Sequence, residues 1–496
     1  MHISAQNIRF IFGLKLKQLR ADSNFSLSEL SALTNISKSY LNEIEKGKKY
    51  PKPEKINKLA SVLNTSYDDM VSLQLDKKLS PISSLVKSNL LDELPLDFFG
   101  VNAHDLLVLL SNAPTQFSAF VDAIIRIGRE HDFKVESLYF SVLRSYQEMH
   151  DNYFPDLEKI AQSLRKNLQL QAHSSSNLEK LILLLETEYG YRIILDGFSK
   201  QSELKNLRYL LVPSKKPTLL LNKRLSYTQQ LFILSREVGF KLLNVTNRPL
   251  TSSWIETLSF EHVLNNFKSY YLASALLLDE RSFTKGLVDF TKKEIFNPTE
   301  VIALIKANKV SAEVFMIRIT NLVPKYFRYT QLFFTRYNHS LNEHTFTKTK
   351  ALHGSGLAQI ASNHLELKAC QRWVALDALN QLQAIQDKKS YQQPICTIHK
   401  VNFENSTNQY LVITVAHPIE PGNNLNCSLS VGFLINKRFV SQTKFANDST
   451  ITQHVVTNTW LNKKIKVHDG ISTADVFSRE QEVKKLRSEI QKILKQ

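Results

Sequence analysis

Residues 26–47 read SLSELSALTNISKSYLNEIEKG, and this stretch predicts two short helices joined by a tight turn at 34–36. Ser26 and Glu29 have the spacing of a capping box, in which the two side chains satisfy each other's backbone amides at a helix start. Ser37 is a second N-cap, so the next helix is predicted to run over residues 38–46. It ends at Gly47, because glycine readily adopts the left-handed backbone of a helix C-terminus.

Apolar residues extend this helical pattern to both sides of the stretch. Before it they recur at helical spacing, at Ile8, Phe12, Leu16 and Leu19. After Pro51 and Pro53 they recur again, at Ile56, Leu59, Val62 and Leu63. In the first short helix, Leu27, Leu30 and Leu33 are predicted to face inward. Residues 1–75 are therefore predicted to form an all-α helix-turn-helix bundle.

The second short helix is the candidate DNA-reading element of this bundle. An α-helix fits the major groove and presents its N-terminal side chains to base edges, while lysines beside it contact phosphates. The predicted DNA-contacting residues are Ser26, Ser28, Ser37, Lys38, Ser39, Tyr40, Asn42, Glu43, Lys46 and Lys48. The alternative is a solvated helical bundle whose lysines only keep it soluble.

The same residues resemble a known family. Residues 28–31, the run 36–47 and the following Pro-x-Pro look like the Cro/phage-repressor (XRE) family of helix-turn-helix proteins, and the I-E-x-G element at 44–47 is specific. The resemblance implies binding to double-stranded DNA. Because two half-sites multiply the affinity of a small reading head, we expect a homodimer.

Composition limits the remaining possibilities. The chain of 496 residues suggests three or four domains, and a hydrophobic content of 43% excludes wholesale disorder. Neither G-x-G-x-x-G nor G-x-x-x-x-G-K occurs, which excludes the common nucleotide-phosphate loops. The net charge of +17 favours an anionic partner, although residues 1–75 carry only +4 of it. Three scattered cysteines, with no signal sequence and no spanning stretch, predict a cytoplasmic protein without membrane contact.

Residues 85–200 have helical periodicity and are predicted to form a helical linker or dimerisation region. Strands are predicted near 192–195, 209–212 and 218–222, followed by a helix from about Ser226. Residues 201–340 are predicted to form an α+β domain. That helix resembles the His-Glu-x-Gly-His helix of ImmA/IrrE-type zinc peptidases. In the positions that the resemblance assigns to zinc ligands, the chain has Arg236, Phe240 and Asn266, and only Glu237 is retained.

Arginine and phenylalanine cannot bind zinc, because one is a cation and the other has no lone pair. We therefore expect no metal, no cofactor and no enzymatic activity from this pseudo-peptidase domain. Arg236 is predicted to pair with Glu237 or to contact an anionic ligand. The alternative is that both side chains lie on a solvated helix face.

Residues 345–475 are predicted to form a second α+β domain, in which a helix at 374–382 packs against antiparallel strands at 394–401, 410–416 and 427–434. A strand at 332–336 precedes it, with alternating faces. The domain order and the Cys370…Trp373 pair resemble the short-chain fatty-acyl regulator family, although the family's other C-terminal cysteines are mostly absent. The resemblance implies that this region senses an acyl-CoA-like metabolite.

A ligand of that kind needs cations for its phosphates and an apolar slot for its acyl chain. The candidate ligand-binding residues are Arg318, Arg336, Arg372 and Trp373. Each has an alternative interpretation as a structural or surface residue.

Residues 476–496 are predicted to form a C-terminal helix whose stripe of Val483, Leu486, Ile490 and Ile493 docks on its own chain or on a dimer partner. The whole sequence thus predicts a multidomain, sequence-specific DNA-binding transcriptional regulator. Two alternatives stay open. One is a zinc peptidase that cleaves a repressor, and the other is a phage- or toxin–antitoxin-type regulator that acts by protein contact.

Overall fold

The computed structural model describes residues 5–72, 135–171, 174–198, 204, 207–251, 259–342, 345–353, 373–387, 393–403, 406–419, 425–456, 465–467 and 488–494. The chain divides into two compact units, Met1–Lys134 and Val135–Gln496. None of the helices in these described ranges is long and apolar enough to cross a membrane.

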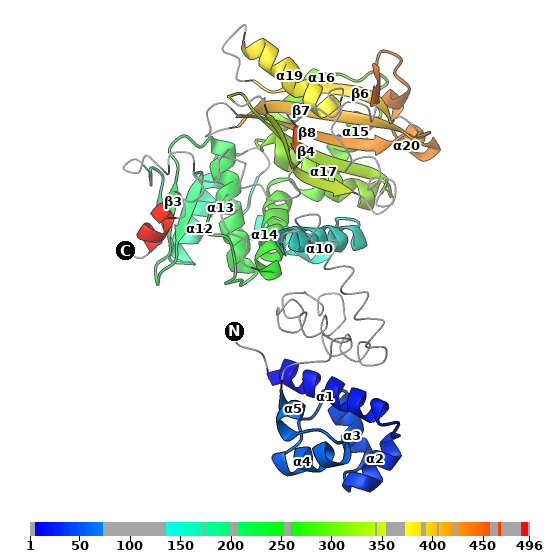
Figure 1. The fold of residues 1–496 in the computed structure, drawn as a ribbon. Coiled ribbons are helices and arrows are strands. Elements are labelled where there is room, and N and C mark those ends of the chain that lie inside the picture. The colour runs from blue at the N-terminus through cyan, green and yellow to red at the C-terminus, as the bar shows by residue number, and fades with distance from the viewer. Residues whose placement is uncertain are drawn as a thin grey trace. The chain divides into compact units, whose positions relative to one another are not determined.

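The first unit is a helical bundle, drawn in blue in Figure 1. Its helices are α1 (Ala5–Asp22), α2 (Leu27–Thr34), α3 (Lys38–Glu45), α4 (Pro53–Val62) and α5 (Tyr67–Val71). The capping box at Ser26 and the N-cap at Ser37 are confirmed. Gly47 has a φ of 71°, as predicted for the end of α3. The short helix α5, capped by Ser66, was not predicted.

One side chain of α2 departs from the prediction. Leu33 was predicted to face inward but is 56% exposed. Leu30 and Thr34 take the inward side of this two-turn helix instead, because residues four apart share a helix face.

Helix α1 is held tightly against the C-terminal end of α3. Gly13 permits this approach, since a Cβ there would lie 2.2 Å from the carbonyl oxygen of Ile44. Arg20 then forms a bidentate ion pair with Glu45, with Nε–Oε1 at 2.6 Å and Nη2–Oε2 at 3.0 Å. Glu45 is buried, so the acidic residue of the I-E-x-G element fixes α3 in the bundle.

The second unit begins with helices around a small sheet. The strands are β1 (Arg192–Ile194), β2 (Tyr209–Val212) and β3 (Thr218–Leu221), in the order β1-β3-β2. The helices are α10 (Val135–Met149), α11 (Pro155–Asn167), α12 (Asn177–Thr187), α13 (Tyr227–Leu242) and α14 (Phe260–Leu277). One core joins Leu164 of α11 and Leu181 of α12 to these strands and to α13. It therefore spans residue 200, where we had predicted a domain boundary.

A mixed sheet of seven strands forms the rest of this unit, in the order β10-β5-β4-β8-β7-β6-β9. The strands are β4 (Leu332–Ser340), β5 (Thr345–His353), β6 (Ile395–Phe403), β7 (Gln409–Pro418), β8 (Leu425–Leu434), β9 (Gln453–Val456) and β10 (Ile465–Val467). The inner pairs are antiparallel as predicted, but β10–β5 and β6–β9 are parallel. Because β4 pairs with both β5 and β8, the sheet also spans the boundary that we had predicted after residue 340.

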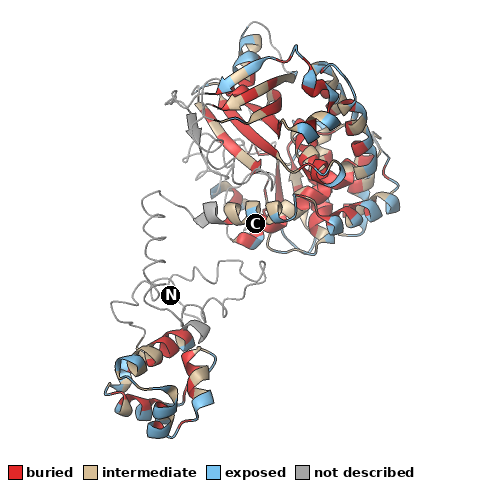
Figure 2. Ribbon diagram, turned by 90° about the vertical axis from the view of Figure 1, so that its right-hand side faces the viewer, coloured by how far each residue is buried: buried red, intermediate tan, exposed pale blue. Residues whose placement is uncertain are grey.

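Helices cover both faces of the large sheet (Figure 1). One face is covered by α19 (Val374–Gln386). The other is covered by α15 (Glu280–Thr291), α16 (Pro298–Ala307) and α17 (Ala312–Tyr326), with the short α20 (Lys437–Gln442) and η4 (Lys444–Asn447) at one end. Consequently β4 is buried on both faces, as the red strands in Figure 2 show, rather than alternating between core and solvent.

The C-terminal helix at 488–494 docks on its own chain. Ile490 is buried with Phe198, Leu204, Leu207 and Leu210, and Ile493 packs beside it. Val483 and Leu486, which we had placed on the same stripe, lie outside the described residues.

Candidate functional sites

The surface of α3 is the first candidate site, and two N-caps and a left-handed turn position it. Asn35 adopts a φ of 56° at the end of α2, and Ser31 Oγ donates to the carbonyl of Ile36 at 2.6 Å. Ile36, Leu41 and Ile44 are buried, so the opposite face of α3 points outward. Lys38 and Ser39 are exposed at its start, and Asn42 and Glu43 are partly exposed.

The other predicted contact residues surround this helix. Ser26, Ser28 and Ser37 are exposed at the helix starts, and Lys48 is exposed beyond Gly47. Tyr40 is turned toward α4, where the Lys55 ammonium lies 4.1 Å from its ring centroid. Tyr40 thus packs within the bundle, whereas the serines and Lys48 are open to solvent.

A second candidate site is a cavity of about 330 Å³ in the second unit, bordered by α13, α14, α17 and the large sheet. Its charged lining consists of four cations and one carboxylate: Arg208, Arg236, Arg336, Lys350 and Glu313. An excess of positive groups in a concave, partly buried site favours an anionic ligand.

Glu313 neutralises only part of this charge. Its carboxylate accepts from Arg336 Nη1 at 3.2 Å and also from Lys350. Burial alone would raise the pKa of Glu313, but these two cations hold that pKa well below its usual range. The carboxylate is thus ionised and shared, whereas Arg208 and Arg236 have no carboxylate partner among the described residues.

Arg236 is one of the buried cations of this lining, at 7% exposure. Its Nη2 donates to Asn266 Oδ1, and its Nε–H has no hydrogen-bond partner within the described ranges. A buried donor without a partner costs roughly 1–3 kcal/mol, so a ligand atom that accepts from it would be favoured.

A smaller, apolar cavity of about 160 Å³ adjoins the charged one. The two cavities share Asn266, Tyr270 and Lys350 in their walls. The apolar lining of the smaller cavity is Phe140, Leu143, Val263, Phe267, Ile317, Phe334 and Leu352. The combination provides a cationic compartment and, next to it, a slot for a short hydrocarbon chain.

Glu237, which occupies the glutamate position in the predicted resemblance to the zinc-peptidase helix, does not line the charged cavity. Glu237 is fully buried and forms a bidentate pair with Arg248, at 2.5 and 2.9 Å, while Tyr191 Oη donates to it at 3.1 Å. The predicted Arg236–Glu237 pair is therefore wrong, and so is a solvated face for both, because both side chains are buried and each has a different partner. Arg236, Phe240 and Asn266 do not fit zinc.

One family model matches the chain, within the first unit. Residues 16–70 match the helix-turn-helix family (HTH_3). The match runs through the α2–turn–α3 stretch and includes all of the exposed residues of α3.

The helix-turn-helix domain is also similar to the uncharacterized HTH-type transcriptional regulator RghRB of Bacillus subtilis (strain 168), with 36% identity over 62 residues. That similarity covers 12% of this chain and 45% of the relative, so the chain matches about half the length of that protein. Among solved structures, a Mycobacterium tuberculosis transcriptional regulator has a TM-score of 0.45 and 14% identity, covering 64% of this chain and 89% of that one.

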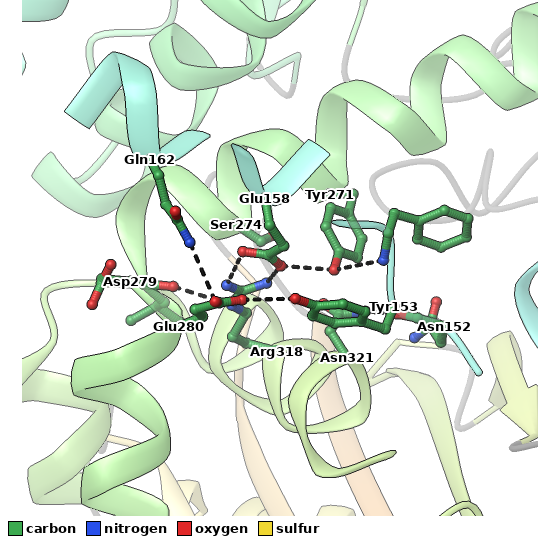
Figure 3. A network of polar contacts seen from close by, with 12 residues as sticks. Asn152, Tyr153, Glu158, Gln162, Tyr271, Ser274, Asp279, Glu280, Arg318 and Asn321 are labelled. Carbon is green, nitrogen blue, oxygen red and sulfur yellow. Dashed lines mark hydrogen bonds and ion pairs between the residues drawn. The ribbon is translucent and has the colours of Figure 1, made fainter. Parts of the chain in front are cut away.

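Arg318, predicted as a ligand cation, lies in the interior and lines neither of the two cavities. It is fully buried and pairs with Glu158 at 2.6 and 2.9 Å, and Glu158 also accepts from Tyr271 Oη at 2.7 Å (Figure 3). Asn321 Nδ2 donates to the carbonyl of Asn152, so the same network ties α17 to the start of α11. Arg318 Nε donates to the carbonyl of Leu278 and both terminal nitrogens donate to Glu158, so the guanidinium is engaged within the fold.

Of the remaining predicted ligand residues, only Arg336 lines the charged cavity. Trp373 is buried as the first residue before α19, in the core on the other face of the sheet, and Arg372 lies outside the described residues. Sequence reasoning missed Arg208, Lys350 and Glu313, because strands and helices distant in sequence bring them together.

Proposed function

We propose that the protein is a sequence-specific DNA-binding transcriptional regulator, acting as a cytoplasmic homodimer, whose second unit senses a small anionic acyl metabolite. The helix-turn-helix match and the exposed face of α3 support the DNA-binding part. One reading head buries little surface, so two copies on neighbouring half-sites would supply the affinity.

The observation that carries the sensing part is the pair of adjoining cavities. Phosphate or carboxylate groups would bind Arg208 and Arg236 in the larger one, because guanidinium groups form strong charge-assisted hydrogen bonds with them. A short acyl chain would enter the apolar slot past Tyr270. An acyl thioester of coenzyme A has both parts.

The position of this site makes a regulator a better proposal than a peptidase. Arg236 and Asn266 line the charged cavity. They stand at the positions that the resemblance to zinc peptidases assigns to metal ligands, and an arginine there suits an anion and not a metal ion. Glu237 is held by Arg248 and Tyr191 and is not available as a base.

Replacing Asn42 by alanine is expected to weaken binding to the operator by about 1–3 kcal/mol with little effect on random DNA, since an amide side chain reads base edges. Replacing Lys48 by alanine should weaken binding to both DNAs and lower the slope of affinity against salt by about one, as for one lost phosphate contact. Fluorescence anisotropy with a selected operator and a shuffled duplex, at several salt concentrations, measures both effects.

Asn57→Ala on the exposed side of α4 is the matched control and should leave both affinities unchanged. An equal loss on operator and shuffled DNA from Asn42→Ala would contradict the reading role of α3.

Replacing Arg236 by glutamine should weaken binding of butyryl coenzyme A about tenfold, because a charge-assisted contact is lost. Isothermal titration calorimetry with acetyl and butyryl thioesters and with free coenzyme A separates the two compartments. The butyryl thioester is expected to bind more tightly than free coenzyme A, because its chain enters the apolar slot.

Arg192→Gln, at an exposed arginine of β1, is the control for charge alone. The sensing proposal fails if the unmodified protein binds none of these compounds, or if Arg236→Gln and Arg192→Gln bind them equally well.

A further inference from the structure

One wall of the charged cavity contains a cysteine and a histidine that face each other. His417 near the end of β7 is the direct partner of Cys427 on β8, and the His417 Nε2–Cys427 Sγ distance is 3.3 Å. The other ring nitrogen, Nδ1, lies 2.7 Å from the carbonyl oxygen of Pro418. Since a carbonyl only accepts, Nδ1 carries a proton and Nε2 is directed at the sulfur.

The charges around this pair favour a thiolate and an imidazolium. Burial alone would raise the pKa of Cys427, but His417 and then Arg336 lower that pKa below its usual value, against a smaller opposing effect of Glu313. Burial alone would lower the pKa of His417, but the charge of Cys427 raises it. Both pKa shifts favour the state in which the shared proton lies on the His417 imidazole and not on the Cys427 sulfur.

The pair is accessible from the cavity even though Cys427 itself is only 2% exposed. Both residues line the 330 Å³ cavity, which also contains the partnerless Nε–H of the buried Arg236. The side chains of Arg336 and Lys350 line the same cavity from the neighbouring strands β4 and β5. The Cys427–His417 pair therefore borders a cavity whose surroundings stabilise negative charge.

Cys396 on β6 provides a contrast within the same sheet. Burial raises the pKa of Cys396 to about 12, and among the described residues its sulfur has one weak hydrogen bond, to the backbone carbonyl of Thr397 3.9 Å away. Cys396 pairs across β6–β7 with Val415, whereas Cys427 on β8 pairs with His417, two residues further along β7. Cys396 and Cys427 are therefore two strand steps and two residues of register apart. At ~4.8 Å per strand step that separation is about 10 Å or more, beyond the reach of a disulfide.

We propose that Cys427 is an oxidation site that reacts with hydrogen peroxide or a similarly small hydroperoxide, with His417 as its proton partner. The thiolate attacks one peroxide oxygen, an S–O bond forms and the O–O bond breaks. The leaving hydroxide takes the proton from the His417 imidazolium and departs as water. Sulfur loses two electrons to the peroxide, and the products are a sulfenic acid, neutral imidazole and water.

The test uses the full-length protein, exposed to hydrogen peroxide in the presence of dimedone, which traps sulfenic acids. Peptide mapping by mass spectrometry then gives the labelling rates of Cys427 and Cys396 in the same sample. We expect Cys427 to be labelled at least about tenfold faster than Cys396, because reactivity follows the thiolate. Equal rates, or labelling of Cys427 only after unfolding, would overturn the proposal.

His417→Gln keeps a hydrogen-bonding side chain but cannot carry the proton. Labelling of Cys427 in this variant should fall about tenfold at pH 7, while its circular dichroism spectrum stays that of the unmodified protein. An unchanged rate in a folded variant would show that His417 has no part in the reaction.

The pH profile of the unmodified protein is a second readout that needs no variant. The charged groups facing Cys427 are His417 on β7, Arg336 on β4, Lys350 on β5 and Glu313 on α17. Their net effect keeps Cys427 ionised to a lower pH than an ordinary cysteine. As the pH falls, the labelling rate of Cys427 should therefore reach half its maximum at a lower pH than that of a free cysteine peptide measured alongside. A profile that coincides with the peptide would contradict the ion pair.

Discussion

Replacing Glu158 by glutamine is expected to destabilise the second unit by about 3–5 kcal/mol, because it leaves the fully buried Arg318 without a counter-charge. Glu158 also accepts from Tyr271, so the same change weakens the contact between α11 and α14. Urea unfolding followed by tryptophan fluorescence measures the loss. All three tryptophans of the chain, Trp254, Trp373 and Trp460, belong to the second unit.

The matched control is Glu300→Gln, which removes the exposed partner of Lys293. A surface pair of this kind contributes about 0–1 kcal/mol. The double variant Glu158→Gln, Arg318→Met should recover much of the lost stability, since no buried charge then stays unpaired. If Glu158→Gln costs no more than Glu300→Gln, the network in Figure 3 does not stabilise the fold.

Replacing Gly13 by alanine should destabilise the helix-turn-helix domain by about 2 kcal/mol, although alanine is the better helix former. The new Cβ would lie 2.2 Å from the Ile44 carbonyl oxygen, so α1 must move away from the end of α3. That movement separates Arg20 from Glu45 and displaces α3. Hydrogen exchange of the α1 and α3 amides in the full chain reports the change locally.

Gly286→Ala in α15 is the same substitution where nothing lies within 4 Å of the added Cβ. There we expect a gain of about 0.5–1 kcal/mol, because only helix propensity changes. If the α3 amides exchange at the same rate in the Gly13→Ala protein and in the unmodified protein, the close approach of α1 does not hold α3 in place.

The features of the first unit that could be predicted from the sequence are local ones. Ser26, Ser37 and Gly47 act on their own helix ends, so spacing alone identifies them. The ion pair that holds α3 could not be predicted, because Arg20 and Glu45 are 25 residues apart and belong to different helices. Leu33 was misplaced because a helix of two turns has too few residues to define its inner face.

In the second unit, strands were predicted better than the way they pair. The predicted strands 410–416 and 427–434 place His417 and Cys427 at facing strand ends, which an antiparallel pairing would bring together. The pairing of β4 with β8 joins residues about 90 positions apart, and periodicity contains no signal for it. Arg336 was identified, but Lys350, which faces it across β4–β5, and Glu313, which comes from α17, were not.

The most direct test of DNA recognition by α3 is the ratio of two affinities of the full-length protein. One is its affinity for the operator obtained by selection from random duplexes, and the other is its affinity for a shuffled duplex of the same composition, both at about 150 mM salt. We expect the selection to converge on one motif and the ratio to reach about 10³ or more. No convergent motif and a ratio near one would contradict sequence-specific binding.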